Sequence, residues 1–234
     1  MPSFLKDISS FYGNREKNQE GQTLEEFLET YDPYKYKNPS VTTDAVVFSC
    51  EGIYKNSLDK LKVLLIKRGN HPSIGFWALP GGFINLEENL KDTAARELRE
   101  ETGVESLPME QFAVYGDYDR DPRARIITAA YMALIDEDAV NVNAGDDAAD
   151  AAWCQVEMEQ SGQQVVRGYT EKTYVLSFVN EEKGVHTKAE VVHKTRGSLI
   201  KEESFKVADG GEIAVDHAAI IAQAVLILKE RLEG

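Results

Sequence analysis

Three glutamates, Glu97, Glu100 and Glu101, lie close together near the end of the stretch GGFINLEENLKDTAARELREETGV, which runs from Gly81 to Val104. Their spacing of three and four positions places them on one side of a helix. There they repel one another and face the negative end of the helix dipole, at a total cost of about 2 kcal/mol. A hard divalent cation with oxygen ligands, such as Mg²⁺, would remove this conflict and leave positions open for substrate phosphates. The alternative is an acidic face exposed to solvent.

The helix that carries these acids has both of its ends marked in the sequence. Asn89 is a suitable N-cap residue, and Gly103 stands where a left-handed residue commonly ends a helix. Apolar residues recur every four positions between them, so we expect a helix over about residues 90–102. Arg96 and Arg99 supply some positive charge, but we expect them to flank the acids at other angles around the helix axis.

The same stretch resembles the signature of the Nudix hydrolases at every specified position. Gly82 is followed after five residues by Glu88, and after seven more by the run RELREETGV from Arg96 to Val104. In that family a loop-helix-loop of this pattern binds Mg²⁺ or Mn²⁺ and cleaves a nucleoside diphosphate linked to another group. The resemblance therefore implies a Nudix pyrophosphohydrolase.

The resemblance also implies a role for each residue of the pattern. The metal ligands would be one backbone carbonyl and three carboxylates, those of Gly82, Glu97, Glu100 and Glu101. Glu88 and Arg96 would form the pair that fixes the helix to the preceding loop. A carboxylate must also take a proton from the attacking water, and this base could be Glu100, Glu101 or an acid on a separate loop, where Asp147 is a candidate.

Segments on either side of this pattern are similar to the ADP-ribose pyrophosphatase branch of the family. The similarity covers roughly residues 40–153 and 215–232, including LLIKRGNHPSIGFWALPGGF and RDPRARIITAAYMALI. It implies ADP-ribose as the leading substrate, cleaved to AMP and ribose 5-phosphate. Other nucleoside diphosphate sugars, dinucleotides and NADH are the alternatives.

Several side chains outside the acidic helix are candidates for substrate contacts. A planar guanidinium binds phosphate or ribose oxygens with two hydrogen bonds, which makes Arg68 and Arg123 candidates; surface salt bridges are the alternative. Trp77 and Phe83 could stack on a nucleobase, although packing in the core is favoured over stacking. His217 is interpreted as an ordinary residue in the first turn of the closing helix.

The remaining elements predict an α/β (α+β) fold. Residues 1–39 are expected to form an N-terminal arm with one short helix, capped by Thr23. Residues 40–234 are expected to form the Nudix domain, a sandwich of a mixed β-sheet between helices. Its strands are the apolar runs TTDAVVFSC, LKVLLIKR, FAVYGDYD, RIITAAYMALI and AAWCQV, and its last helix is DHAAIIAQAVLILKERL.

Residues 157–213 do not match the family pattern and are interpreted as an insertion before the last helix. Its stretches YVLSFVN and HTKAEVVHK alternate as the two strands of a hairpin that turns at NEEKG, and a polar segment follows. An isolated hairpin is at best marginally stable, so these strands must extend their own sheet or pair across a subunit interface. We therefore expect a homodimer whose interface includes the insertion or the N-terminal arm.

Composition limits the remaining function classes. The net charge of −14 opposes a nucleic acid partner, and the apolar runs are too short to span a membrane or to form a secretory signal. A cytoplasmic protein is therefore expected. Cys50 and Cys154 are expected to be buried free thiols.

Two non-enzymatic functions are the alternatives to a hydrolase. Some relatives of this branch are transcriptional regulators that add a winged helix at the C-terminus, whereas this chain ends two residues after Leu232 and retains all the acids of the pattern. A hydrolase is therefore favoured over an ADP-ribose-sensing regulator, and a non-catalytic nucleotide-binding module comes third.

Overall fold

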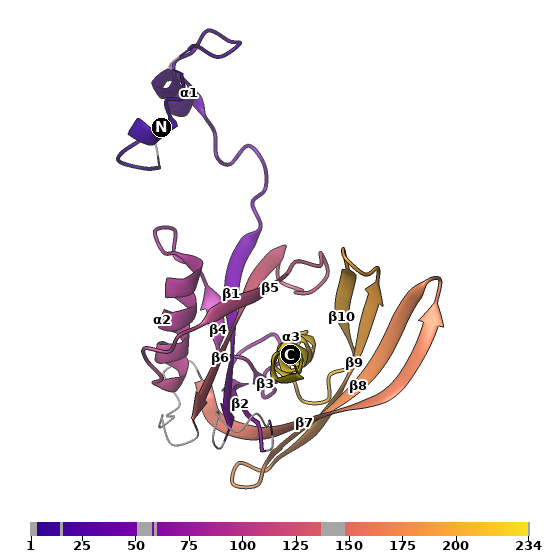
Figure 1. Ribbon diagram of the computed structural model, residues 1–234. Helices are drawn as coiled ribbons and strands as arrows, with labels where there is room; N and C mark the ends of the chain where they lie inside the picture. Colours follow the sequence, from indigo (N-terminus) through magenta and orange to yellow (C-terminus); the bar gives the residue numbers. More distant parts are fainter. Residues whose placement is uncertain (1–3, 15, 51–57, 59, 137–147, 234) are drawn as a thin grey trace. The chain divides into compact units, whose positions relative to one another are not determined.

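The computed structural model of the chain describes residues 4–14, 16–50, 58, 60–136 and 148–233 (Figure 1). The chain divides into two compact units, residues 1–39 and residues 40–234. Asp147, the candidate loop acid, lies outside the described residues. No helix of the described part is both long and apolar enough to cross a membrane.

The first unit contains a 3₁₀ turn, η1 (Ser9–Phe11), and one short helix, α1 (Leu24–Thr30). Thr23 caps α1 as predicted, through a reciprocal pair of bonds with Glu26. The Glu26 N–H donates to Thr23 Oγ1 at 3.3 Å, and the Thr23 N–H donates to Glu26 Oε2 at 2.8 Å. This capping box satisfies two backbone donors that the helix itself leaves unpaired.

The second unit is built on one mixed sheet, in the order β10-β9-β8-β7-β2-β1-β6-β5. β1 and β6 run parallel, and the other neighbouring pairs of this order are antiparallel. Two short strands lie off the order, β3 on β2 and β4 on β1. The bounds are β1 Ser40–Cys50, β2 Lys62–Arg68, β3 Trp77–Ala78, β4 Gly81–Phe83, β5 Glu110–Tyr115, β6 Ile126–Asp136, β7 Ala148–Val166, β8 Tyr169–Asn180, β9 Val185–Arg196 and β10 Glu202–Asp209.

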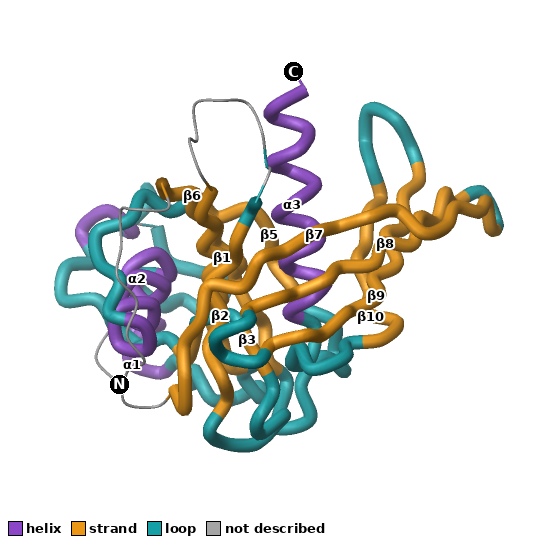
Figure 2. Tube along the Cα trace, turned by 90° about the horizontal axis from the view of Figure 1, so that it is seen from below, coloured by secondary structure: helices purple, strands orange, loops and turns teal. Residues whose placement is uncertain are grey.

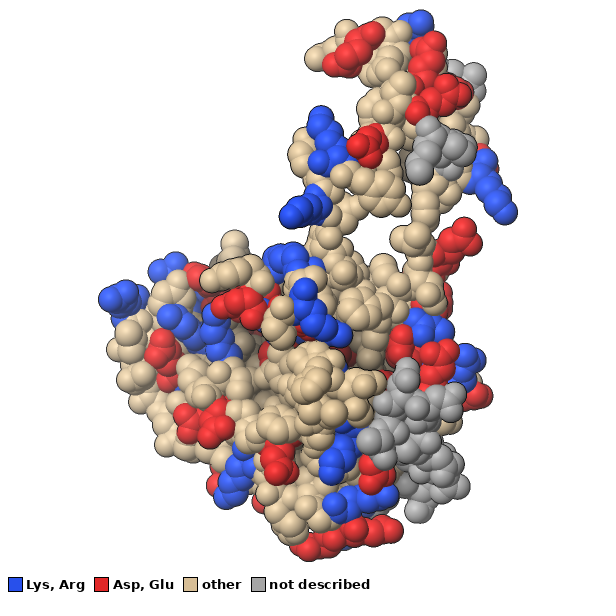
Figure 3. Space-filling model, turned by 180° about the vertical axis from the view of Figure 1, so that it is seen from behind, with Lys and Arg blue, Asp and Glu red and all other residues tan. Residues whose placement is uncertain are grey.

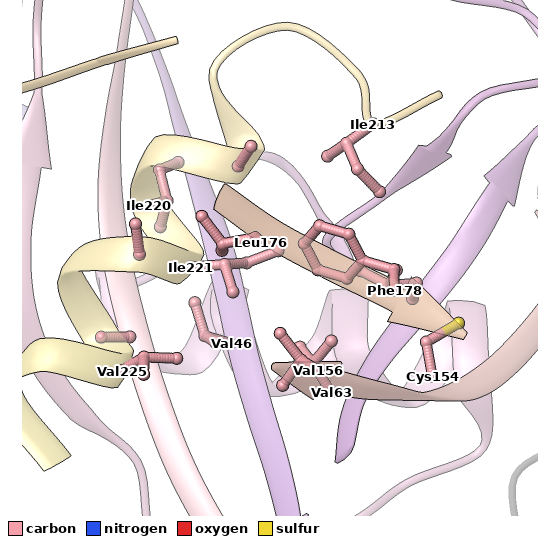
Figure 4. Packing of buried hydrophobic residues seen from close by; sticks show 14 of the residues in the cluster. Val46, Val63, Cys154, Val156, Leu176, Phe178, Ile213, Ile220, Ile221 and Val225 are labelled. Atoms are coloured by element: carbon pink, nitrogen blue, oxygen red, sulfur yellow. The ribbon is translucent and has the colours of Figure 1, made fainter. Parts of the chain in front are cut away.

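Two helices cover opposite faces of this sheet (Figure 1). α2 (Leu90–Thr102) is amphipathic and buries Ala94 and Leu98 against one face. α3 (His217–Glu233) is apolar over most of its length. The sheet curves around it in Figure 1, and Figure 2 shows the helix from the side, with β7 passing across it. The expected mixed sheet between helices is confirmed. Its main core lies between α3 and the inner face of the sheet, where Ile220 and Ile221 meet Leu176 and Phe178 (Figure 4).

The segment interpreted as an insertion continues the central sheet. The predicted hairpin is present as β8 and β9, but β7 runs through to Val166 without a break, and β10 lies in the stretch that was expected to be only polar. Four apolar side chains of the predicted hairpin strands are buried within this chain: Tyr174, Leu176, Phe178 and Val191. The hairpin thus finds its partner in its own sheet, and the homodimer stays a prediction.

Acidic and basic side chains are mixed on one face of the protein. On the face shown in Figure 3, blue and red side chains alternate over the described residues without a continuous basic area. Both cysteines are buried free thiols, as expected. Burial raises the pKa of the Cys154 thiol to about 12, so this thiol is protonated at neutral pH.

Candidate functional site

A cleft of about 440 Å³ lies where β1, β2, β4, α2 and the start of α3 come together. Glu97 and Glu101 of α2 line it, as do Gly82 and Phe83 of β4. The helix bounds are those predicted, and Gly103 ends α2 with a φ of 73°. The Asn89 side chain makes no capping bond to the backbone; its amide donates to Asp92 Oδ2 at 3.0 Å.

Arg96 connects the acids of α2 to the preceding loop. Its Nε lies 2.9 Å from Glu88 Oε1, and its Nη1 lies 2.6 Å from Glu97 Oε1 and 3.0 Å from Glu100 Oε2. Its Nη2 also donates to the Phe83 carbonyl at 3.0 Å. The expectation that Arg96 would flank the acids at another angle is therefore wrong, because its side chain extends to Glu97 and Glu100. The expected Glu88–Arg96 pair is present.

The charges around Arg96 shift the pKa values of its partners. The hydrogen bond from Arg96 lowers the pKa of Glu88 to about 2, and the bonds from Glu88, Glu97 and Glu100 raise that of the guanidinium. Glu88 also accepts a bond of 2.8 Å from Thr93 Oγ1. The pair is thus ionised over the physiological range and holds the loop to the first half of α2.

Glu101 is only partly exposed to solvent. Its Oε2 accepts a bond of 2.8 Å from the Gly81 N–H. Burial, with repulsion from Glu97 and Asp44, nevertheless raises the pKa of Glu101 to about 8. A positive charge that enters the cleft would stabilise the ionised form of this carboxyl group.

Gly82 lies directly against Glu97. A Cβ atom at position 82 would be 2.5 Å from the carboxylate carbon of Glu97, so any other residue here would displace the Glu97 side chain. As the side chains stand, no three His, Cys, Asp or Glu side chains of the described part converge on a single ion site, and Arg96 holds Glu97 and Glu100. The donors nevertheless suit a hard divalent cation, because they are carboxylate and carbonyl oxygens at a glycine that leaves room.

The candidate substrate residues surround the same cleft. Arg68, Phe83 and Arg123 all line it. Arg68 Nε donates to the Pro72 carbonyl at 2.7 Å, and burial lowers the pKa of Arg68. Arg123 is bonded to Asp121 at 2.9 Å, and its guanidinium lies 5.4 Å from the Phe83 ring centroid. Both arginines therefore reach the cleft, and part of the hydrogen-bonding capacity of each guanidinium is already used within the protein.

The two aromatic candidates differ in burial. Trp77 is only 3% exposed and belongs to the core, as favoured from the sequence, whereas Phe83 is 45% exposed at the cleft. Phe83 therefore does not pack in the core.

A largely buried polar network at the same cleft was not predicted. Asp44 of β1 accepts a bond of 2.7 Å from Thr128 Oγ1 and lies 3.8 Å from Arg120 Nη2. Arg120 in turn is bonded to Asp216 at 2.8 Å, and His217 Nε2 lies 3.9 Å from Asp44 Oδ1. The one local signal was Asp44 itself, an acid next to the apolar run AVVF in a predicted strand. His217, interpreted as an ordinary helix residue, lines the cleft.

Comparison with known proteins agrees with the family resemblance of the sequence. The family model described as the NUDIX domain matches residues 45–172, more than half of the 234-residue chain. A solved structure, a MutT/nudix family protein from Enterococcus faecalis, superposes with a TM-score of 0.61 at 28% identity, covering 91% of this chain and 75% of that one.

Two curated proteins match the chain over about half of its length. The ADPR responsive transcriptional repressor NtrR of Acinetobacter baylyi is 42% identical over 47% of this chain and 42% of its own length. An ADP-ribose pyrophosphatase of Methanocaldococcus jannaschii is 37% identical over 50% of this chain and 62% of its own length. The matches thus span about half the length of these relatives, one a regulator and the other an enzyme.

Proposed function

Because the chain belongs to the NUDIX domain family, we propose that it is a metal-dependent hydrolase that cleaves the pyrophosphate of a nucleoside diphosphate linked to another group. ADP-ribose is the proposed substrate, with AMP and ribose 5-phosphate as products. The similarity to an ADP-ribose pyrophosphatase and the cleft residues support this choice. The proposal includes Mg²⁺ or Mn²⁺ as cofactor, a cytoplasmic location, a homodimer and no nucleic acid partner.

One observation carries the proposal. Glu97 and Glu101 face a cleft beside Gly82, and the Glu88–Arg96 pair holds the intervening loop onto the same helix. Carboxylate and carbonyl oxygens are the ligands that hard cations prefer, so these acids beside Gly82 support a cation site more than a purely solvated acidic face. Mg²⁺ or Mn²⁺, when bound, would neutralise the pyrophosphate and stabilise the leaving oxygen.

The protein's own residues would bind the substrate and move one proton. Arg68 and Arg123 would bind phosphate or ribose oxygens, and Phe83 would offer its exposed ring to the nucleobase. Water would attack one phosphorus, forming a new P–O bond as the bond to the bridging oxygen breaks. Glu100, Glu101 or an acid on a separate loop would take the proton of that water, and these alternatives stay open.

A product assay tests the proposal. Purified protein is incubated with Mg²⁺ and a panel of nucleoside diphosphate compounds that includes ADP-ribose, other nucleoside diphosphate sugars, dinucleotides and NADH. Chromatography should detect AMP and ribose 5-phosphate from ADP-ribose at the highest rate. If another member of the panel were cleaved faster, that compound would become the proposed substrate, and the proposed type of reaction would stand.

An ADP-ribose-sensing transcriptional regulator is the second candidate, favoured by the similarity to the repressor. It predicts binding of ADP-ribose without turnover, together with specific binding of a duplex operator. A mobility shift with nanomolar affinity at physiological salt, in a protein that leaves ADP-ribose intact, would replace the hydrolase with this function. A protein that binds the nucleotide but neither cleaves it nor binds DNA would be a non-catalytic binding module.

A further inference from the structure

A strained turn leads into α3. Val215 has a φ of 48°, in the left-handed region that β-branched residues rarely adopt. The backbone around it is held by two bonds, from the Ala214 N–H to the Trp77 carbonyl at 2.8 Å and from the His217 N–H to the Ala214 carbonyl at 3.1 Å. Such outliers persist only where the surrounding structure fixes them, and they gather at functional sites. The turn places Asp216 and His217 at the start of α3.

His217 holds one wall of the cleft. The ring is nearly buried, and its Nδ1 accepts a bond of 2.7 Å from the Leu79 N–H. Two residues further on, the Gly81 N–H donates to Glu101 at 2.8 Å. The segment that ends at Gly82 is therefore held from α3 at one point and from α2 at another. A shift of Leu79 would move the Gly82 carbonyl relative to the acids of α2.

Asp216 holds a second wall through Arg120. The Arg120 guanidinium donates from Nε and Nη2 to the two oxygens of Asp216, at 2.8 and 2.9 Å. The Arg120 side chain is only 7% exposed, so this two-bond pair is shielded from solvent. Arg120 begins the short segment that carries Arg123, which lies over Phe83 at the cleft.

We infer that Asp216 and His217 are positioning residues for two different parts of the site. His217 fixes the position of the Gly82 backbone relative to the acids of α2, the candidate metal ligands. Asp216, through Arg120, sets Arg123 for binding the substrate. The two adjacent residues therefore act on different kinetic constants: His217 on turnover and Asp216 on substrate affinity. The kinetic part of this inference rests on the proposed hydrolase function.

The kinetic test compares three variants of the full chain with ADP-ribose and Mg²⁺. His217→Leu removes the acceptor for the Leu79 N–H and should lower kcat, with KM within about twofold of wild type. His217→Asn offers an oxygen close to the position of Nδ1 and should restore most of kcat. Asp216→Asn removes the charge that holds Arg120 and should raise KM about tenfold or more, with a smaller effect on kcat.

A matched control separates positioning from general damage to α3. Gln223 of α3 accepts a bond of 2.7 Å from Tyr115 Oη and does not line the cleft of the candidate site. Gln223→Leu should therefore leave kcat and KM unchanged even where it lowers the melting temperature. If all three positions changed kcat and KM together, or if none did, the inference would be overturned.

A binding measurement separates this inference from the proposed function. Calorimetric titration with ADP-ribose, without added metal, should give a Kd about tenfold higher for Asp216→Asn than for wild type. For His217→Leu the Kd should be nearly unchanged. If wild type binds ADP-ribose here but does not cleave it in the kinetic assay with Mg²⁺, the hydrolase proposal fails, and this difference in Kd still supports distinct roles for the two residues. Equal Kd values for wild type and Asp216→Asn would overturn the inference, as would a wild-type protein that neither binds nor cleaves ADP-ribose.

Discussion

Arg96 Nε lies 2.9 Å from Glu88 Oε1, which joins the middle of α2 to the loop that precedes it. The same guanidinium bonds the Phe83 carbonyl, so the pair fixes the loop at two points. The contribution of such a charged pair to the free energy of unfolding depends on pH, and it can be measured without an activity assay.

The first prediction concerns acid stability. The pKa of Glu88 is lowered from 4.5 to about 2 in the folded protein, so its contribution is present above pH 4.5 and is lost as the pH falls from about 4.5 to about 2. Glu88→Gln should therefore lower the free energy of unfolding at neutral pH, and the difference from wild type should shrink over that window. Urea unfolding at a series of pH values measures it. Glu87→Gln is the exposed control, and an equal effect in the control would contradict the assignment.

The second prediction concerns Gly82. In Gly82→Ala the new Cβ would lie 2.5 Å from the Glu97 carboxylate carbon, so one of the two must move. Because displacement of a catalytic group by about 1 Å can cost about 100-fold in rate, we expect a loss of that order with the fold retained. The control is Gly116→Ala, whose Cβ would find its nearest neighbour, Ile127, at 3.9 Å. Steady-state kinetics and circular dichroism measure both, and similar activities in the two variants would contradict the site.

The third prediction concerns turnover. Glu100→Gln and Glu101→Gln keep the shape of the side chain but remove its ability to ionise and bind a cation, so each should cut kcat by several orders of magnitude in a folded protein. Glu105→Gln, an exposed acid just beyond the end of α2, should be unaffected. Near-normal turnover in both α2 variants would reject the roles proposed for these acids.

The fourth prediction concerns metal binding without turnover. A cation that binds only the folded protein at about 100 times its Kd adds about 2.7 kcal/mol of stability, or roughly 5–10 °C in melting temperature for a unit of this size. Calorimetry with Mg²⁺ and with chelator should show this shift in wild type. It should be lost in a Glu97→Gln, Glu100→Gln double variant; the same shift in both proteins would place the ion elsewhere.

Local features were predictable because their causes are local. The bounds of α2 match those expected from Asn89, Gly103 and the four-residue apolar repeat between them, although the Asn89 side chain makes no capping bond to the backbone. The reach of Arg96 was mispredicted, because spacing along a helix places the Cβ atom and leaves the end of a long side chain free to rotate.

Features that depend on contacts between distant parts of the chain had little local signal in the sequence, apart from Asp44 beside the apolar run AVVF. Asp44, Arg120 and Asp216 meet only because β1, the segment before β6 and the start of α3 are brought together by the fold. The order of strands in the sheet also depends on such distant contacts. Period-two alternation predicts that a strand exists, but not which strand it pairs with. The hairpin of β8 and β9 was therefore found, while its continuity with β7 was not.

The fifth prediction follows from that continuity. Phe178 of β8 is fully buried against α3, and β8 pairs with β7, which also pairs with β2 of the central sheet. Phe178→Ala should cost about 3–5 kcal/mol and shift one cooperative transition of the whole second unit. Val165→Ala, at a site that is 72% exposed near the end of β7, should have little effect. A separate early transition in Phe178→Ala, with the main transition unchanged, would mean that the strands beyond β7 fold as an independent unit.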